Sequence, residues 1–318
     1  MKTGIFGLAG AGKTTVFNLL TGLDAATGFG GGKKANMGVT RVPDSRVDFL
    51  TSVYTPKRTV LAEIVFSDMP GQAPSKSGGG LDPQVVGELR TMEVLVLVLR
   101  AFLNPALTDS ADPMRDLESM EAELLLADLS IIEKRLLRLS KEKGHEREEE
   151  ALKLCLAHLE EERPLRTLDL AAEQWLLLKG FRFLSEKTLL VVVNASEDEP
   201  TFVPDGFSAR LETMGAYGMT LCASIEQEIA QLDAEEQALF LADLGAEESA
   251  RDRFIQMAYQ AMDLVSFLTA GEDECRAWTI RRDTRAQDAA GKIHSDIARG
   301  FIRAETIHWD LLLEAGSY

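Results

Sequence analysis

An eight-residue stretch near the amino terminus, GLAGAGKT, constrains the fold more than any other part of the chain. It runs from Gly7 to Thr14, follows a short apolar run at 2–6 and precedes residues whose apolar positions have helical spacing. Glycine, four residues, glycine, lysine and threonine form the P-loop pattern, and the strand, loop and helix around it are the context that this pattern requires. The sequence therefore predicts a phosphate-binding loop between a strand and a helix.

The residue types in this loop suit a polyphosphate. Glycines let successive backbone N–H groups turn inward around phosphate oxygens, and the positive end of the following helix points at them. Lys13 is predicted to reach the β and γ phosphates, and the Thr14 hydroxyl is predicted to bind Mg²⁺. The predicted phosphate-binding residues are Ala9, Gly10, Ala11, Gly12, Lys13, Thr14 and Thr15.

A second motif, IVFSDMPG, ends an apolar run at Asp68. A nucleotide-bound Mg²⁺ needs a carboxylate at the end of the strand beside the P-loop strand, so Asp68 is the predicted metal partner of Thr14. Gly71 is predicted to offer its backbone N–H to a γ-phosphate, a contact that exists only before hydrolysis. The motif therefore predicts a loop that senses the state of the nucleotide.

Base choice is predicted from the stretch VVVNASED. GTPases end this strand in Asn-Lys-x-Asp, whose acid binds guanine, but here the corresponding residues are Asn194, Ala195, Ser196 and Glu197. The lysine is absent and the acid is one methylene longer, whereas an asparagine amide can meet the donor and acceptor of adenine. ATP is the predicted ligand, and the alternative is that Asn194 only ties loops together.

Continuous apolar runs at 2–6, 61–66, 94–99 and 189–193 are typical of strands covered on both faces. They predict an α/β fold with a mostly parallel sheet. After Ala223 the chain is predicted to be helical, including the stretch up to Leu268. Beyond Glu274 the pattern predicts a strand at 275–280, a helix at 286–298 and a strand at 301–306.

The segment 120–184 is rich in leucine and charged residues, and it separates the third and fourth predicted strands. Its apolar residues step by three and four along one helical seam, and Gly144 then offers a turn before a second, shorter stripe. The pattern predicts an antiparallel helical hairpin inserted into the α/β domain. The seam consists of Leu125, Leu129, Ile132, Leu136 and Leu139, and the return stripe of Leu152, Cys155 and Leu159.

Net charge, apolar runs and cysteine number indicate which partners and which cellular compartment to expect. A net charge of −17 disfavours extended binding to nucleic acid, and no DNA partner is expected. No apolar run approaches the roughly 20 residues that span a bilayer, so neither a membrane partner nor export is expected. Three scattered cysteines do not suit a disulfide framework, which favours a cytoplasmic protein.

Together these motifs resemble the YchF family of Obg-related P-loop ATPases, of the TRAFAC class. The resemblance extends to MGVTRVPDSR at 37–46, to CASIEQEIA at 222–230 and, most specifically, to RAWTI at 276–280, AAGKIHSDI at 289–297 and GFIRAET at 300–306. The last three look like the TGS domain of the family, a β-grasp fold. The resemblance implies a slow ATPase that acts as a molecular switch and is associated with the ribosome or ribosomal RNA.

The expected domains follow from the patterns and the resemblance together. They are a P-loop domain in two parts, 1–119 and 185–268, a hairpin at 120–184, and a TGS-like α+β domain at 269–318 that is expected to be incomplete. The predicted base-side residues are Asn194, Ala195, Glu197, Ala223 and Ser224.

Two departures from the family pattern affect the predicted chemistry. Gly32 stands where the family has a switch threonine, and neither Thr27 nor Thr40 aligns with it. Gln72 replaces an apolar family residue, and in Ras-like GTPases a glutamine at this position orients the attacking water. Gln72 is therefore predicted to be catalytic with Lys13 and Gly71, the alternative being a solvent-facing side chain. Two rival functions remain at this point. One is an Obg-type GTPase, and the other is an ATP-binding ribosome or RNA adaptor with negligible hydrolysis.

Overall fold

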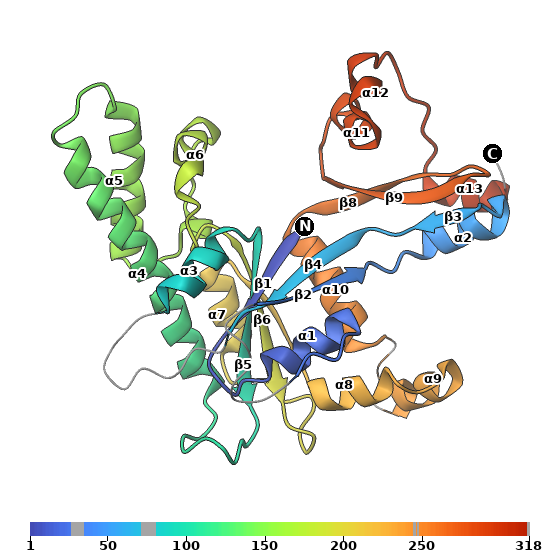
Figure 1. Cartoon of the computed structure of the whole chain (residues 1–318), viewed down its shortest axis with the longest axis horizontal. Coiled ribbons are helices and arrows are strands. Elements are labelled where there is room, and N and C mark those ends of the chain that lie inside the picture. The colour runs from blue at the N-terminus through green and yellow to red at the C-terminus, as the bar shows by residue number, and fades with distance from the viewer. Residues whose placement is uncertain (27–34, 71–80, 244–245, 247, 317–318) are drawn as a thin grey trace. The chain divides into compact units, whose positions relative to one another are not determined.

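The computed structural model describes residues 1–26, 35–70, 81–243, 246 and 248–316 (Figure 1). The chain divides into two compact units. One contains residues 1–39 and 65–251, and the other contains residues 40–64 and 252–318. Residues 40–64 thus group with the C-terminal residues rather than with their neighbours in sequence, a pairing that the linear pattern of the chain did not predict.

The first unit is organised by a six-stranded sheet with the order β2-β4-β1-β5-β6-β7. The pairs from β4 through β1, β5 and β6 to β7 are all parallel. The mostly parallel sheet and its four predicted strands are confirmed, while β2 and β7 were not predicted. The strands are β1 Lys2–Phe6, β2 Asn36–Arg41, β4 Glu63–Asp68, β5 Val94–Ala101, β6 Thr188–Ala195 and β7 Tyr217–Leu221.

The two central strands are buried on both faces, which explains their unbroken apolar sequence. Alternate side chains of β5 and β6 belong to one core cluster, together with residues from helices that cover the sheet. Parallel strands require such crossover helices. The helices of this unit outside the hairpin are α1 Lys13–Thr21, α3 Pro83–Arg90, α7 Phe207–Met214, α8 Ala223–Ile229 and α9 Ala234–Asp243.

The predicted hairpin is confirmed. It consists of α4, Pro113–Leu139, and α5, Glu146–Glu160, with Gly144 at a φ of 89° between them. Every residue of the predicted seam and return stripe lies in or against one buried cluster. α4 begins earlier than expected, because the Asp112 side chain caps it by accepting a hydrogen bond from the Arg115 N–H at 3.0 Å. The short elements that follow are η1 Leu165–Thr167, α6 Ala172–Leu178 and η2 Lys179–Phe181.

The second unit contains a three-stranded sheet with the order β3-β9-β8, in which β9 is parallel to β3 and antiparallel to β8. Its strands are β3 Arg58–Val60, β8 Leu264–Thr269 and β9 Glu274–Arg281. Helices α2 Ser45–Tyr54, α11 Ala286–Ile293, α12 Ser295–Arg299 and α13 Trp309–Ala315 belong to it, and α10, Ala250–Ala261, leads into it.

Two sequence predictions for this unit were wrong. Residues 264–268 are a strand rather than a helix, because they pair with β9. Phe267 lies opposite Trp278 in this pairing, and the centroids of the two stacked rings are 6.3 Å apart. Residues 301–306 are not a strand. They join neither edge of the three-stranded sheet, and Ile302 is 92% exposed. The predicted helix at 286–298 is divided in two at His294, whose backbone is extended.

Within the described part of the chain, no helix combines the length and the apolar character that a membrane crossing demands.

Candidate nucleotide-binding site

The loop between β1 and α1 has a backbone that only glycine adopts easily. Gly7 has a φ of 145°, and a Cβ atom there would lie 2.5 Å from the Val98 carbonyl oxygen. Gly12, the N-cap of α1, has a φ of 86°, and its Cβ would lie 2.2 Å from Asn194 Nδ2. The glycines of the P-loop pattern are therefore required by positive φ and by close approach of neighbouring strands.

Replacing Gly12 by alanine is expected to lower the affinity for an adenine nucleotide by about tenfold. The new methyl group displaces the Asn194 amide, and the hydrogen bond that this amide is expected to make to the base is lost. Fluorescence titration with a labelled ATP measures this affinity. Gly22→Ala is the matched control, since Gly22 caps the other end of α1 at a φ of 68° and has no neighbour within 4 Å. Equal affinity losses in both variants would show that backbone strain alone is responsible.

Lys13 lies in the first turn of α1 and is 6% exposed. Its ammonium donates a hydrogen bond to the Leu8 carbonyl oxygen at 2.8 Å, so the side chain folds back over the loop. Burial lowers the pKa of Lys13 to about 8, and the charge of Asp68 acts in the opposite direction. A buried cation with so little compensation suits an anionic ligand.

Thr14 and Asp68 are brought together as predicted from the sequence. β4 lies beside β1 with Asp68 opposite Ile5, so the carboxylate reaches the start of α1. The Thr14 hydroxyl donates to Asp68 Oδ2 at 2.8 Å, and Asn36 Nδ2 is 3.3 Å from the same oxygen. Burial raises the pKa of Asp68, while these two hydrogen bonds and Lys13 lower it.

This pair has the chemistry of a magnesium site. Asp68 Oδ1 is buried and has no hydrogen-bond partner within the described chain, so one carboxylate oxygen is available for a ligand. No group of three or more histidine, cysteine or acidic side chains in the described residues could hold a metal. Mg²⁺ commonly takes one or two protein oxygens and completes its shell with water and phosphate, which fits this donor set.

Asn194, at the carboxyl end of β6, connects three segments. Its Nδ2 donates to the Ala11 carbonyl oxygen at 3.2 Å, and its Oδ1 accepts from the Ala223 backbone N–H at 3.1 Å. The side chain is 5% exposed. Asn194 therefore ties the P-loop to the start of α8. An amide nitrogen carries two protons and an amide oxygen two lone pairs, so each group retains capacity for one further bond.

The remaining predicted residues are placed as follows. Ala195 is buried at the end of β6, Glu197 is exposed in the loop after it, and Ala223 and Ser224 form the first turn of α8. Thr15 is half-buried in the first turn of α1, and Ala9, Gly10 and Ala11 form the loop itself. Thr40 is buried in β2. Gly71, Gln72, Thr27 and Gly32 lie outside the described residues.

Three residues of this site were not predicted from the sequence. Asn36 contacts Asp68, as described above, and Asn104 Nδ2 lies 3.4 Å from the Gly10 carbonyl oxygen. Arg100, at the end of β5, donates to the carbonyl oxygens of Phe102 and Asp109 and so shapes the loop that carries Asn104. None of the three belongs to a recognisable local motif. Asn36 and Asn104 act on segments distant in sequence, whereas Arg100 acts on the loop directly after its own strand.

The chain was compared with known protein families and with curated proteins. A family model described as "YchF-GTPase_C: Protein of unknown function (DUF933)" matches residues 264–318. The protein named "Ribosome-binding ATPase YchF" of Bacillus subtilis (strain 168) is 37% identical over 332 residues, which cover 99% of this chain and 91% of the relative. The protein of the same name from Escherichia coli O157:H7 is 37% identical, with 97% of this chain and 89% of the relative covered.

A solved structure agrees with these relatives. The structure of the Schizosaccharomyces pombe YchF GTPase matches with a TM-score of 0.83 and 26% identity, and the match covers 100% of this chain and 90% of that one. The resemblance inferred from the motifs is thereby confirmed over nearly the whole length of the chain. This chain belongs to the YchF family.

Proposed function

We propose that this protein is a Mg²⁺-dependent ATPase that hydrolyses slowly and acts as a nucleotide-controlled switch on the ribosome, in the cytoplasm. The observation that carries the proposal is the convergence of the P-loop, the Thr14–Asp68 pair and Asn194 at the carboxyl ends of adjacent parallel strands. Ligands of open α/β sheets bind at this edge. The names of the curated relatives support both the ATPase activity and the ribosome as partner.

The phosphates would be held by the backbone N–H groups of the loop and by Lys13. The Thr14 hydroxyl and the Asp68 carboxylate would hold Mg²⁺, which neutralises charge on the β and γ phosphates when bound. Gly71 would sense the γ-phosphate through its backbone N–H. Two observations support these roles: the Lys13 ammonium is buried, and Asp68 Oδ1 has no hydrogen-bond partner in the described residues.

The free capacity of the Asn194 amide supports adenine as the base. One proton of Nδ2 and one lone pair of Oδ1 are committed to the protein, and the remaining pair matches the N7 acceptor and N6 donor of adenine. Ala195 and Glu197 follow at positions where a guanine clamp would need lysine and aspartate. Guanine presents its oxygen where adenine presents its N6 donor, so the same amide fits it less well.

Nucleotide specificity tests this proposal directly. We expect fluorescent ATP to bind more tightly than fluorescent GTP in the presence of Mg²⁺, and we expect chelation of Mg²⁺ to weaken the binding of ATP. The Schizosaccharomyces pombe relative is called a GTPase, so the opposite preference has a concrete precedent. Tighter GTP binding would overturn the role given to Asn194. If neither ATP nor GTP binds, the proposed function as a whole is overturned.

The ribosome is tested separately. Co-sedimentation with purified ribosomes is compared in a non-hydrolysable ATP analogue, in ADP and without nucleotide. A switch predicts that the bound fraction depends on the nucleotide, because a ligand shifts an equilibrium only through different affinities for the two states. Identical bound fractions in all three conditions would contradict the switch, although not the ATPase activity.

Replacing Gln72 by alanine is expected to lower the rate of ATP hydrolysis by about 10²-fold while ATP affinity changes little. The physical reason is that a water-orienting side chain acts on the attacking water rather than on the bound nucleotide. Single-turnover phosphate release measures the rate, and Gln84→Ala, in the first turn of α3, is the control. An unchanged rate would leave Gln72 without a catalytic role and would leave the ATPase proposal intact.

A further inference from the structure

α3 is the first described helix after Asp68, and it shares a core cluster with the first half of α4. Leu81, Val85 and Leu89 lie in the core cluster that also contains the α4 residues Leu117, Met120 and Leu124. From Leu125 onward the buried apolar side chains of α4, which are Leu125, Ile132 and Leu139, belong instead to the cluster inside the hairpin. One continuous helix therefore has its first part in the core and its second part in the hairpin.

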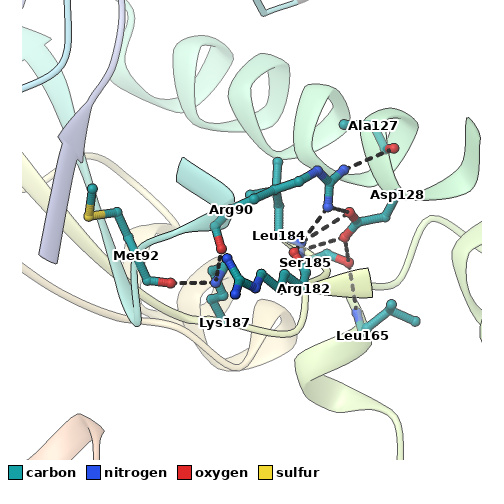
Figure 2. A network of polar contacts seen from close by, with 9 residues as sticks. All are labelled: Arg90, Met92, Ala127, Asp128, Leu165, Arg182, Leu184, Ser185 and Lys187. Carbon is teal, nitrogen blue, oxygen red and sulfur yellow. Dashed lines mark hydrogen bonds and ion pairs between the residues drawn. The ribbon is translucent and has the colours of Figure 1, made fainter. Parts of the chain in front are cut away.

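Polar contacts to α4 come from the carboxyl end of α3 and from the residue before its N-cap. Leu81, which precedes the N-cap Asp82, donates its backbone N–H to Glu123 Oε2 at 3.1 Å. At the carboxyl end, Arg90 donates to Asp128 Oδ1 at 3.0 Å and to the Ala127 carbonyl oxygen at 3.2 Å (Figure 2). α4 is thus bonded to Arg90 at the carboxyl end of α3 and to Leu81 just before its amino end.

Asp128 lies where α4 leaves the core for the hairpin, and it is fully buried. Besides Arg90 it accepts hydrogen bonds from the backbone N–H groups of Leu184 and Ser185, at 3.0 and 2.8 Å, and from the Ser185 hydroxyl at 2.9 Å (Figure 2). Residues 184 and 185 lie shortly before β6, which begins at Thr188. Because a buried carboxylate that loses such partners is strongly disfavoured, this point of α4 is held against the sheet.

The carboxyl end of α3 is held at the same place. The Lys187 ammonium donates to the carbonyl oxygens of Arg90, at 3.2 Å, and of Met92. A cation at this end also complements the helix dipole. Arg90, Asp128, Ser185 and Lys187 therefore form one polar junction between α3, α4 and the start of β6 (Figure 2).

We propose that α4 is a lever whose fulcrum is this junction. A displacement of α3 would move the part of α4 before Asp128, through Glu123 and the shared apolar cluster, and the rigid helix would carry the opposite displacement into the hairpin. The inference rests on the proposed function, because α3 is displaced only if the loop after Asp68 responds to the nucleotide. It assigns the hairpin the role of a reporter of nucleotide state, driven through Arg90 and Glu123 as positioning residues.

Distance measurements between spin labels test the lever. One label is placed at Lys141→Cys, beyond the end of α4, and the other at Lys2→Cys, at the start of β1; both positions are exposed, and the three native cysteines are buried. We expect the distance distribution of the wild-type background to shift between a non-hydrolysable ATP analogue with Mg²⁺ and ADP. The shift is expected to be lost in Arg90→Ala, because α3 is then detached from the fulcrum.

Arg138→Ala, an exposed arginine on the same helix, is the matched control and is expected to keep the shift. Glu123→Ala provides a second variant that cuts the other end of α3, and it decides the question if Arg90→Ala does not fold. ATP affinity is measured on the same samples. Absence of ATP binding would refute the proposed function, whereas normal binding with an unchanged shift in Arg90→Ala and Glu123→Ala, or with no shift in the wild type, would overturn the lever.

Discussion

Replacement of Lys13 by methionine is expected to reduce the rate of ATP hydrolysis by about 10²–10³-fold, the usual effect of removing one preorganised group that stabilises developing charge. Lys13 is buried in the phosphate loop, and its ammonium has the Leu8 carbonyl oxygen as a hydrogen-bond acceptor. A triphosphate would supply the counter-charge that the protein provides only in part. Initial rates of phosphate release with Mg²⁺ and ATP measure the effect.

The stability of the same variant separates this role from a structural one. Burial lowers the pKa of Lys13 to about 8 from its ordinary value of 10.5, so the folded state disfavours the charged form. Between these two values the unfolded chain binds more protons than the folded one, and the stability of the wild type rises with pH across that window. Below pH 8 the full unfavourable contribution is present.

Without nucleotide, Lys13→Met should therefore unfold at a temperature no lower than that of the wild type at pH 7. The difference between the two proteins should shrink as the pH rises from about 8 to 10.5. Thermal unfolding followed by circular dichroism measures both trends. A variant that is strongly destabilised at pH 7 would show that Lys13 supports the fold, and the loss of hydrolysis could then not be assigned to phosphate contacts.

Replacement of Asp128 by alanine is expected to lower the free energy of unfolding by about 3–5 kcal/mol, the typical effect of breaking a buried ion pair from one side. The change leaves Arg90, which is 14% exposed, without its carboxylate partner. It also removes the acceptor of the Leu184 and Ser185 backbone N–H groups. Burial raises the pKa of Asp128, and these contacts lower it, so the carboxylate depends on all of them together.

Urea unfolding followed by circular dichroism measures this loss. Glu149→Ala is the control, because Glu149 forms an ion pair with Lys153 on the hairpin surface, where the two side chains are 35% and 64% exposed. Removal of such a pair changes the free energy of unfolding by about 0.3–0.5 kcal/mol. Similar losses in the two variants would contradict the assignment of Asp128 as the residue that holds α4 to the sheet.

Membership of the YchF family and the local geometry both support the same nucleotide-binding site. The relatives match over nearly the full chain, and the structure brings Thr14 to within hydrogen-bond distance of Asp68. The predicted lack of a switch threonine and the predicted catalytic role of Gln72 both concern residues outside the described ranges. The rate of ATP hydrolysis by the Gln72→Ala variant, compared with that of the wild type, therefore tests most directly whether Gln72 takes part in the reaction.

The sequence alone determined the P-loop, the central strands and the helical hairpin, each of which has a short local pattern. The P-loop follows from glycines whose positive φ no other residue adopts easily, and the central strands follow from unbroken apolar runs. The hairpin follows from the spacing of its leucines, which recurs with the period of a helix. In each case the pattern can be recognised from residues that are close in sequence.

Only the tertiary structure decided the features that join distant segments. Asn36 and Asn104 reach the site from segments that carry no motif, and the grouping of residues 40–64 with 252–318 comes from strand pairing between β3 and β9. The segment 264–268 became a strand because β9 was available to pair with it. The junction around Asp128 is of the same kind, since its partners come from separate stretches of chain and a buried charge is stable only where all of them meet.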